Sequence, residues 1–217
     1  MTSIDEHINV AIADDHPIVL LGIRALFEKN NIVRITHEFS DTASLLHAFN
    51  RNNWDVLILD IDLKDGNGVE ITKQILQFKP KLHILIMSGY PEHNFALRAM
   101  KAGAKGYVNK ATMLEQLEDA VMQVAKGDLY ISHNLAQRLA MEVIRNNHSE
   151  EAHSVLSDRE LQVLCLYGAG RSNQEIAEQL HISAKTVSTY RGRLMEKMNL
   201  DNTSELIAYA INHDLIA

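Results

Sequence analysis

The chain has 217 residues, of which 46% are hydrophobic and 23% are charged, a composition normal for one large or two ordinary globular domains. No apolar run is long enough to cross a bilayer, and the N-terminus lacks a basic stretch followed by an apolar one. We therefore expect a cytoplasmic protein without a membrane partner, and not a secreted or embedded one. The net charge is −7, but residues 183–197 carry a local charge of +3.

Strand-like and helix-like segments alternate through the first 126 residues. The predicted strands lie at 9–13, 33–39, 55–59, 82–87 and 105–109. Helical patterns lie at 17–29, 42–50, 68–78, 92–102 and 113–126. Because parallel strands need right-handed crossovers, this alternation predicts an α/β, flavodoxin-like, doubly wound sheet of five parallel strands. A ligand would bind beyond the carboxyl ends of the first and third strands, where the winding reverses.

Acidic residues end two of these strands. Asp14 and Asp15 follow the first strand and Asp60 follows the third, so their side chains should emerge at one edge of the sheet. Clustered carboxylates repel one another unless a cation joins them. We expect Mg²⁺, or Mn²⁺ in its place, held by Asp15 and Asp60, with Asp14 binding a water and a backbone carbonyl near Asp62 completing the site. His16 lies beside the acid pair, where it either touches the pocket or stays on the surface.

The same edge offers the parts of a phosphoryl-transfer site. Asp60 is the natural nucleophile, because a metal can neutralise the charge of an incoming phosphate. Lys110 follows the fifth strand and can stabilise the phosphoryl oxygens, while Ser88 at the end of the fourth strand can donate its hydroxyl. The product would be an aspartyl phosphate.

Residues 8–126 resemble the receiver domains of two-component response regulators. The resemblance is carried by Asp14, Asp15, Asp60, Ser88, Tyr107 and Lys110. It implies that Asp60 accepts a phosphoryl group from a sensor histidine kinase or a phosphotransfer protein, and that Ser88 and Tyr107 form a switch pair. The chain has Lys64 and Ala111 where the family often has proline.

Two other motifs overlap Asp60. Asp60-Ile61-Asp62 also resembles the opening of haloacid-dehalogenase-type phosphatases, in which the second Asp serves as acid and base. Lys64 stands where those enzymes have Thr or Val, and their chemistry leaves the C-terminal region unexplained. A calcium loop would need Gly66 one residue earlier and a helix before it. The alternatives to a regulator are therefore a metal-dependent phosphatase and a protein-binding adaptor; we expect no enzyme activity beyond the chemistry on Asp60.

The connecting region covers residues 127–154. Residues 134–146 predict a short helix, and 147–153 are polar without an apolar period, which indicates a flexible linker.

Residues 155–217 show only helical patterns and predict a small all-α domain. Helix starts are marked by capping boxes, in which a Ser or Thr and a Glu three residues later satisfy free backbone N–H groups. The chain has three such pairs: Thr112 with Glu115, Ser157 with Glu160, and Ser172 with Glu175. Two short helices joined by a tight turn at 180–182 predict a helix-turn-helix.

The second helix of this motif would lie in the major groove of double-stranded DNA. Ser183 should cap it, Ser188 and Thr189 can reach base edges, and basic side chains can contact phosphates. The predicted DNA-contacting residues are Lys185, Thr186, Ser188, Thr189, Arg191 and Arg193.

This segment resembles the LuxR-type helix-turn-helix of the NarL/FixJ response regulators, and the run 186–191 resembles virulence regulators of the BvgA kind. The family uses its last helix for dimer contacts, which implies that Leu206, Tyr209 and His213 contact a second copy; the alternative for Leu206, and for Ala210, is core packing. We thus predict a receiver domain at 1–126, a linker at 127–154 and a DNA-binding domain at 155–217. Phosphorylation of Asp60 would alter the dimerisation and DNA binding of this transcriptional regulator.

Overall fold

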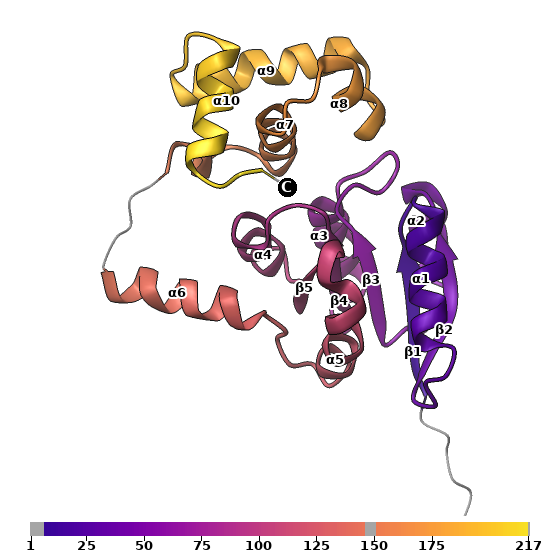
Figure 1. The fold of residues 1–217 in the computed structure, drawn as a ribbon. Coiled ribbons are helices and arrows are strands. Elements are labelled where there is room, and N and C mark those ends of the chain that lie inside the picture. Colours follow the sequence, from indigo (N-terminus) through magenta and orange to yellow (C-terminus); the bar gives the residue numbers. More distant parts are fainter. Residues whose placement is uncertain (1–6, 146–150, 217) are drawn as a thin grey trace, which may run out of the picture. The chain divides into compact units, whose positions relative to one another are not determined.

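The computed structural model describes residues 7–145 and 151–216. The chain forms two compact units (Figure 1). The first unit contains the chain up to Ser88 together with Ala99–Ile131, and the second contains Gly89–Arg98 and the chain from Ser132 onward. In the part of the chain that the structure describes, no helix is both long and apolar enough to span a membrane.

The first unit is built on a five-stranded sheet. Its strands are β1 (Ile8–Ala13), β2 (Val33–Phe39), β3 (Val56–Asp60), β4 (His83–Ser88) and β5 (Gly106–Asn109). All neighbours are parallel, in the order β2-β1-β3-β4-β5, so the chain reverses its winding between β1 and β3. The predicted doubly wound sheet is confirmed, and each observed strand lies within one residue of its predicted bounds.

Helices follow each strand of this sheet. They are α1 (Pro17–Phe27), α2 (Thr42–Ala48), α3 (Gly68–Phe78), α4 (Glu92–Lys101), which begins in the second unit, and α5 (Met113–Ala125). Ile23 of α1 and Leu117 of α5 are fully buried in one apolar cluster with Ile12, Ile58 and Leu85 of the sheet. Burial of each such side chain stabilises the fold by about 1.5–3 kcal/mol. This core therefore holds the strands in register, which fixes the positions of the residues at their ends.

The first unit continues past the end of α5. The backbone N–H of Tyr130 donates to the carbonyl of Lys105 at 2.8 Å, and Tyr130 forms a parallel bridge with Gly106. The unit therefore runs to Ile131, beyond the predicted domain end at residue 126.

The second unit is helical. It contains α6 (His133–Arg145), the 3₁₀ turn η2 (Ala152–Val155), α7 (Asp158–Gly168), α8 (Asn173–Gln179), α9 (Ala184–Met198) and α10 (Thr203–Asn212). Helix α7 packs against α8, α9 and α10. The approach of α7 to α10 is close, because a Cβ on Gly168 would lie 2.6 Å from the Cβ of Ala210.

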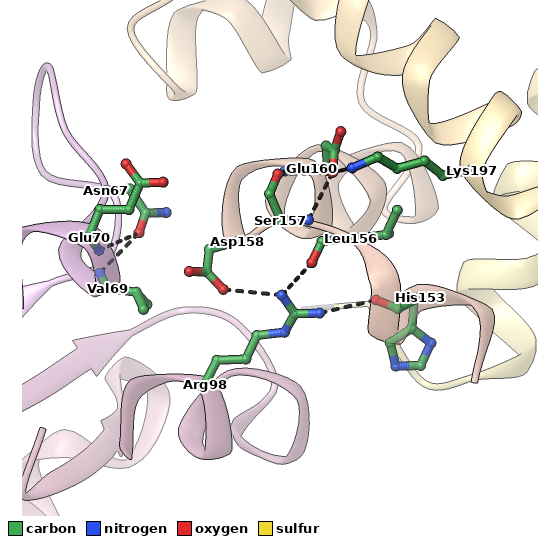
Figure 2. A network of polar contacts seen from close by, with 10 residues as sticks. All are labelled: Asn67, Val69, Glu70, Arg98, His153, Leu156, Ser157, Asp158, Glu160 and Lys197. Atoms are coloured by element: carbon green, nitrogen blue, oxygen red, sulfur yellow. Dashed lines mark hydrogen bonds and ion pairs between the residues drawn. The ribbon is translucent and has the colours of Figure 1, made fainter. Parts of the chain in front are cut away.

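The capping predictions succeed in the second unit and fail in the first. Ser157 and Ser172 both form complete capping boxes, and Ser183 accepts from the N–H of Thr186. Lys197 of α9 also binds the Glu160 carboxylate at 2.7 Å (Figure 2). The Thr112 side chain makes no cap bond, because the chain enters α5 through the 3₁₀ turn η1 (Lys110–Thr112), which begins two residues earlier.

A further polar contact within the second unit was not expected from the sequence. The guanidinium of Arg98 donates to the carbonyl oxygens of Leu156 at 2.7 Å and His153 at 3.0 Å, and pairs with Asp158 at 3.1 Å (Figure 2). Arginine suits this role, since its planar fork can donate to several oxygens at once.

Candidate functional site

The strand ends of the first unit bring the predicted phosphoryl-site residues together. Asp14 follows β1, Asp60 ends β3, Ser88 ends β4 and Lys110 follows β5. Asp14, Asp60 and Ser88 are at most 2% exposed. Parallel pairing aligns these ends, so residues far apart in the chain share one buried pocket.

Lys110 makes the central contacts of this pocket. Its Nζ lies 2.7 Å from Oδ2 of Asp60 and 2.8 Å from Oδ2 of Asp14. Charges this close and this buried interact far more strongly than the same charges in water. One ammonium group therefore bridges two of the three predicted carboxylates.

The electrostatics of the pocket indicate an excess of negative charge. Burial, together with the charges of Asp14 and Asp62, raises the pKa of Asp60 to about 7 despite the opposing effect of Lys110. Burial alone would lower the pKa of Lys110, but Asp60 and Asp14 together raise it above its usual value. A divalent cation would relieve this excess of negative charge.

The donor set fits a hard divalent cation. Ligand atoms of Asp14, Asp15, His16 and Asp60 all lie within 4.8 Å of one another. Carboxylate oxygens are the ligands that Mg²⁺ and Mn²⁺ prefer. Nδ1 of His16 lies 2.8 Å from Asp15 and 3.1 Å from Asp14, so this side chain contacts the acid pair while it remains 56% exposed. The role of the Asp62 carbonyl stays a prediction.

The loop after Asp60 contains a residue that the sequence reasoning missed. A Cβ on Gly68 would lie 2.4 Å from the carbonyl oxygen of Asp60 and 2.9 Å from the Cα of Ile61. The N–H of Gly68 donates to the Ile61 carbonyl at 2.9 Å, and the Asn67 side chain caps α3 (Figure 2). Only glycine allows α3 to begin this close to Asp60. The sequence signal was Gly68 directly after a helix-capping Asn.

The predicted switch residues are both buried. Ser88 and Tyr107 are each 1% exposed, and they lie on the adjacent strands β4 and β5. The Tyr107 ring therefore occupies an inward position in this structure.

In the second unit, α9 carries the predicted DNA-contacting residues on one side. Lys185, Ser188, Thr189 and Arg193 are exposed, and Thr186 and Arg191 are partly exposed. The opposite side is buried, through Val187, Leu194 and Met198. A hollow of about 240 Å³ opens on the polar side, lined by Ser183, Lys185, Thr186, Thr189, Tyr190 and Arg193.

Hydroxyl groups of α9 already have partners within the domain. Ser188 Oγ donates to the Ala184 carbonyl and accepts from Asn173 Nδ2, both at 3.1 Å. Asn173 in turn accepts from the Tyr167 hydroxyl at 2.7 Å. Asn173, which the sequence did not single out, thus orients one of the two predicted base-reading side chains.

The burial of Leu206 decides between its two predicted roles, a dimer contact and core packing. Leu206 is fully buried between the helices of its own unit, so it cannot contact a second copy while the domain stays folded. Helical spacing alone could not separate core packing from a dimer face. Tyr209 and His213 are partly exposed and stack on each other, with ring centroids 4.1 Å apart.

Comparisons with known proteins agree with both units. Residues 10–122 match the response regulator receiver domain, and residues 154–210 match the luxR family of bacterial regulatory proteins. Response regulator UvrY of Escherichia coli K12 is 32% identical over 208 residues, covering 96% of this chain and 95% of UvrY. Oxygen regulatory protein NreC of Staphylococcus carnosus is 32% identical over 213 residues, covering 95% of this chain and 98% of NreC.

Solved structures of a Salmonella typhimurium response regulator, RcsB, are also similar. One has a TM-score of 0.68 at 29% identity and covers 95% of this chain and 98% of RcsB. Another, bound to promoter rprA in the presence of the phosphomimetic BeF₃⁻, has a TM-score of 0.63 at 28% identity, with 94% and 98% coverage. The finer resemblance to BvgA-type regulators stays a prediction. The chain belongs to the two-component response regulators of the NarL/FixJ type, DNA-binding transcription regulators with a receiver domain and a LuxR-type output domain.

Proposed function

We propose that Asp60 is the phosphoacceptor of this regulator and that its phosphorylation controls dimerisation and DNA binding. The observation that carries this proposal is the pair of contacts from Lys110 to Asp60 and Asp14 in a buried pocket. A structural ion pair would match one lysine with one acid, whereas this pocket gathers more negative charge than Lys110 can balance.

Each residue of the pocket has a definite task in phosphoryl transfer. An Asp60 oxygen attacks phosphorus, the bond from phosphorus to the donor histidine nitrogen breaks, and its electron pair stays on that nitrogen. Lys110 stabilises the transferred oxygens and Ser88 donates its hydroxyl to one of them. Mg²⁺, or Mn²⁺, would be held by Asp14, Asp15, Asp60 and the Asp62 carbonyl. When bound, the ion would neutralise the charge of the phosphate.

The buried Ser88 and Tyr107 connect this chemistry to the rest of the receiver. Phosphate on Asp60 adds negative charge that the Ser88 hydroxyl can approach, and the Tyr107 ring on the neighbouring strand would change its packing in response. This pair would convert phosphorylation into a change of receiver surface.

The output is DNA recognition by α9. Lys185, Thr186, Arg191 and Arg193 would contact phosphates, and Ser188 and Thr189 would face base edges. RcsB bound to promoter DNA supports this assignment by similarity. We expect a homodimer on paired half-sites, a sensor histidine kinase or phosphotransfer protein as phosphoryl donor, and action in the cytoplasm, where the chromosome lies. Of the predicted dimer residues, Tyr209 and His213 keep this role in the proposal.

Intact mass measurement after treatment with acetyl phosphate and Mg²⁺ tests the phosphoacceptor. The wild-type chain should gain one phosphoryl group, and Asp60→Asn should gain none. Asp119→Asn, at an exposed position of α5, is the matched control, and its labelling should persist. A phosphoryl adduct that survives Asp60→Asn, or none on the wild-type chain, would contradict the proposal.

Footprinting on genomic DNA tests the output. Acetyl phosphate should strengthen protection at discrete paired sites for the wild-type chain and leave Asp60→Asn unchanged. Equal footprints for both chains would show that DNA binding does not depend on phosphorylation of Asp60, which would contradict the proposal.

A further inference from the structure

A second group of metal-binding side chains lies in the output unit. Glu151 precedes η2, His153 lies within it, and His213 directly follows α10 as its C-cap. One ligand atom from each lies within 4.8 Å of the other two. Nε2 of His153 is 3.0 Å from one Glu151 oxygen, and Nδ1 of His213 is 3.8 Å from the other.

These separations suit a four-coordinate metal ion. Zinc binds imidazole nitrogen and carboxylate oxygen at about 2.0–2.2 Å, so tetrahedral ligand atoms lie roughly 3.3 Å apart. The two separations to Glu151 fall on either side of that value. Three side chains from two segments can therefore close on one ion by small rotations, leaving a fourth position for water.

The surrounding contacts hold the ligands in place. Nδ1 of the buried His153 lies 3.0 Å from the Tyr209 hydroxyl, which directs Nε2 toward Glu151. The His213 ring stacks on the Tyr209 ring at 4.1 Å and 22°. Metal-binding histidines commonly have such a partner on the second ring nitrogen, because it fixes both the tautomer and the ring orientation.

We propose that Glu151, His153 and His213 bind one divalent transition-metal ion, with Zn²⁺ as the best-matched ion. Two imidazoles and one carboxylate favour such ions over Mg²⁺, in contrast to the carboxylate-rich pocket at Asp60. Bound metal would link η2, at the start of the output domain, to the end of its last helix. The regulator would then respond to metal through the stability of its output domain.

Zinc titration of the tag-free full chain tests this site. His16 gives the Asp60 pocket a nitrogen ligand, so this pocket could also bind Zn²⁺. The titration therefore uses the His16→Gln variant in excess Mg²⁺, in which the Asp60 pocket has oxygen ligands only. This chain should bind one equivalent of Zn²⁺ by competition with a chromogenic chelator. Adding His213→Gln should weaken binding at least about tenfold, and adding the exposed His47→Gln should change nothing.

Two further measurements distinguish ligation from a general effect on folding. Co²⁺ in the His16→Gln chain should give the visible absorption of four-coordinate cobalt, and the His213→Gln addition should abolish it while circular dichroism stays unchanged. Tyr209→Phe keeps the ring on His213 but removes the hydroxyl, so Zn²⁺ affinity should fall about tenfold. Equal Zn²⁺ affinity with and without His213, or less than one equivalent bound before that change, would overturn the proposal.

Discussion

The phosphoryl pocket of the first unit and helix α9 of the second both depend on charged side chains, but in opposite surroundings. Asp14 and Asp60 are buried against Lys110, whereas Lys185 and Arg193 extend from an exposed helix face. Buried charges must be balanced by a partner, so the pocket's geometry indicates which ligands it takes. Exposed charges are balanced by water, so α9 alone indicates a DNA surface but no base sequence.

The same contrast sets the size of expected mutational effects. Charge interactions in the buried pocket are barely screened by salt, while those along α9 weaken within a Debye length of about 8–10 Å. Changes in the pocket should therefore be large and chemically specific, and changes on α9 should be smaller, spread over all DNA sequences and dependent on salt.

The largest of three expected effects is that of Lys110→Met. Loss of the ammonium group removes the charge that stabilises the transferred phosphoryl oxygens, so labelling by acetyl phosphate should slow about 100-fold. Time-resolved intact mass measurement at fixed Mg²⁺ gives the rate. Lys101→Met, at an exposed position, is the control and should label normally. A normal labelling rate in Lys110→Met would show that the ammonium group does not assist phosphoryl transfer, and would contradict the expectation that changes in the buried pocket have larger effects than changes on α9.

The same glycine-to-alanine change should have opposite effects in the two regions. Gly68→Ala places a Cβ against the Asp60 carbonyl and should lower the free energy of unfolding by about 1–3 kcal/mol. Gly192→Ala in α9 meets nothing within 4 Å and should raise it by about 1 kcal/mol through helix propensity. Urea unfolding of the full chain measures both. An unchanged or higher free energy of unfolding for Gly68→Ala would mean that the backbone beside Asp60 is not closely packed.

The smallest effect is expected for Arg191→Ala. Loss of one phosphate contact should weaken binding on every DNA sequence alike and reduce the slope of log affinity against log salt by about 1. Fluorescence anisotropy at several salt concentrations gives the slope. Arg171→Ala removes an exposed arginine that pairs with Glu175 outside α9, and should leave the slope unchanged. A sequence-dependent loss for Arg191→Ala would instead assign it to base reading.

Local features of the sequence predicted local features of the structure well. The central strand β3 has an uninterrupted apolar run because both faces of the sheet are covered there, and the Ser157 and Ser172 boxes act within one helical turn. Thr112 failed because Asn109 begins a 3₁₀ turn before it and its side chain takes the capping role there. The sequence left both a dimer contact and core packing open for Leu206, because periodicity shows that a face is apolar, but not which neighbour covers it.

The sequence by itself determined the order of strands and helices, the acids at the strand ends and the basic helix, because each of these features can be recognised from a short contiguous segment of the chain. Only the tertiary structure decided that Lys110 bridges Asp14 and Asp60, that Gly68 must approach the Asp60 backbone, and that His153 and His213 meet Glu151. Those contacts join residues distant in the chain, and their geometry follows from sheet pairing and helix packing, which no local pattern specifies.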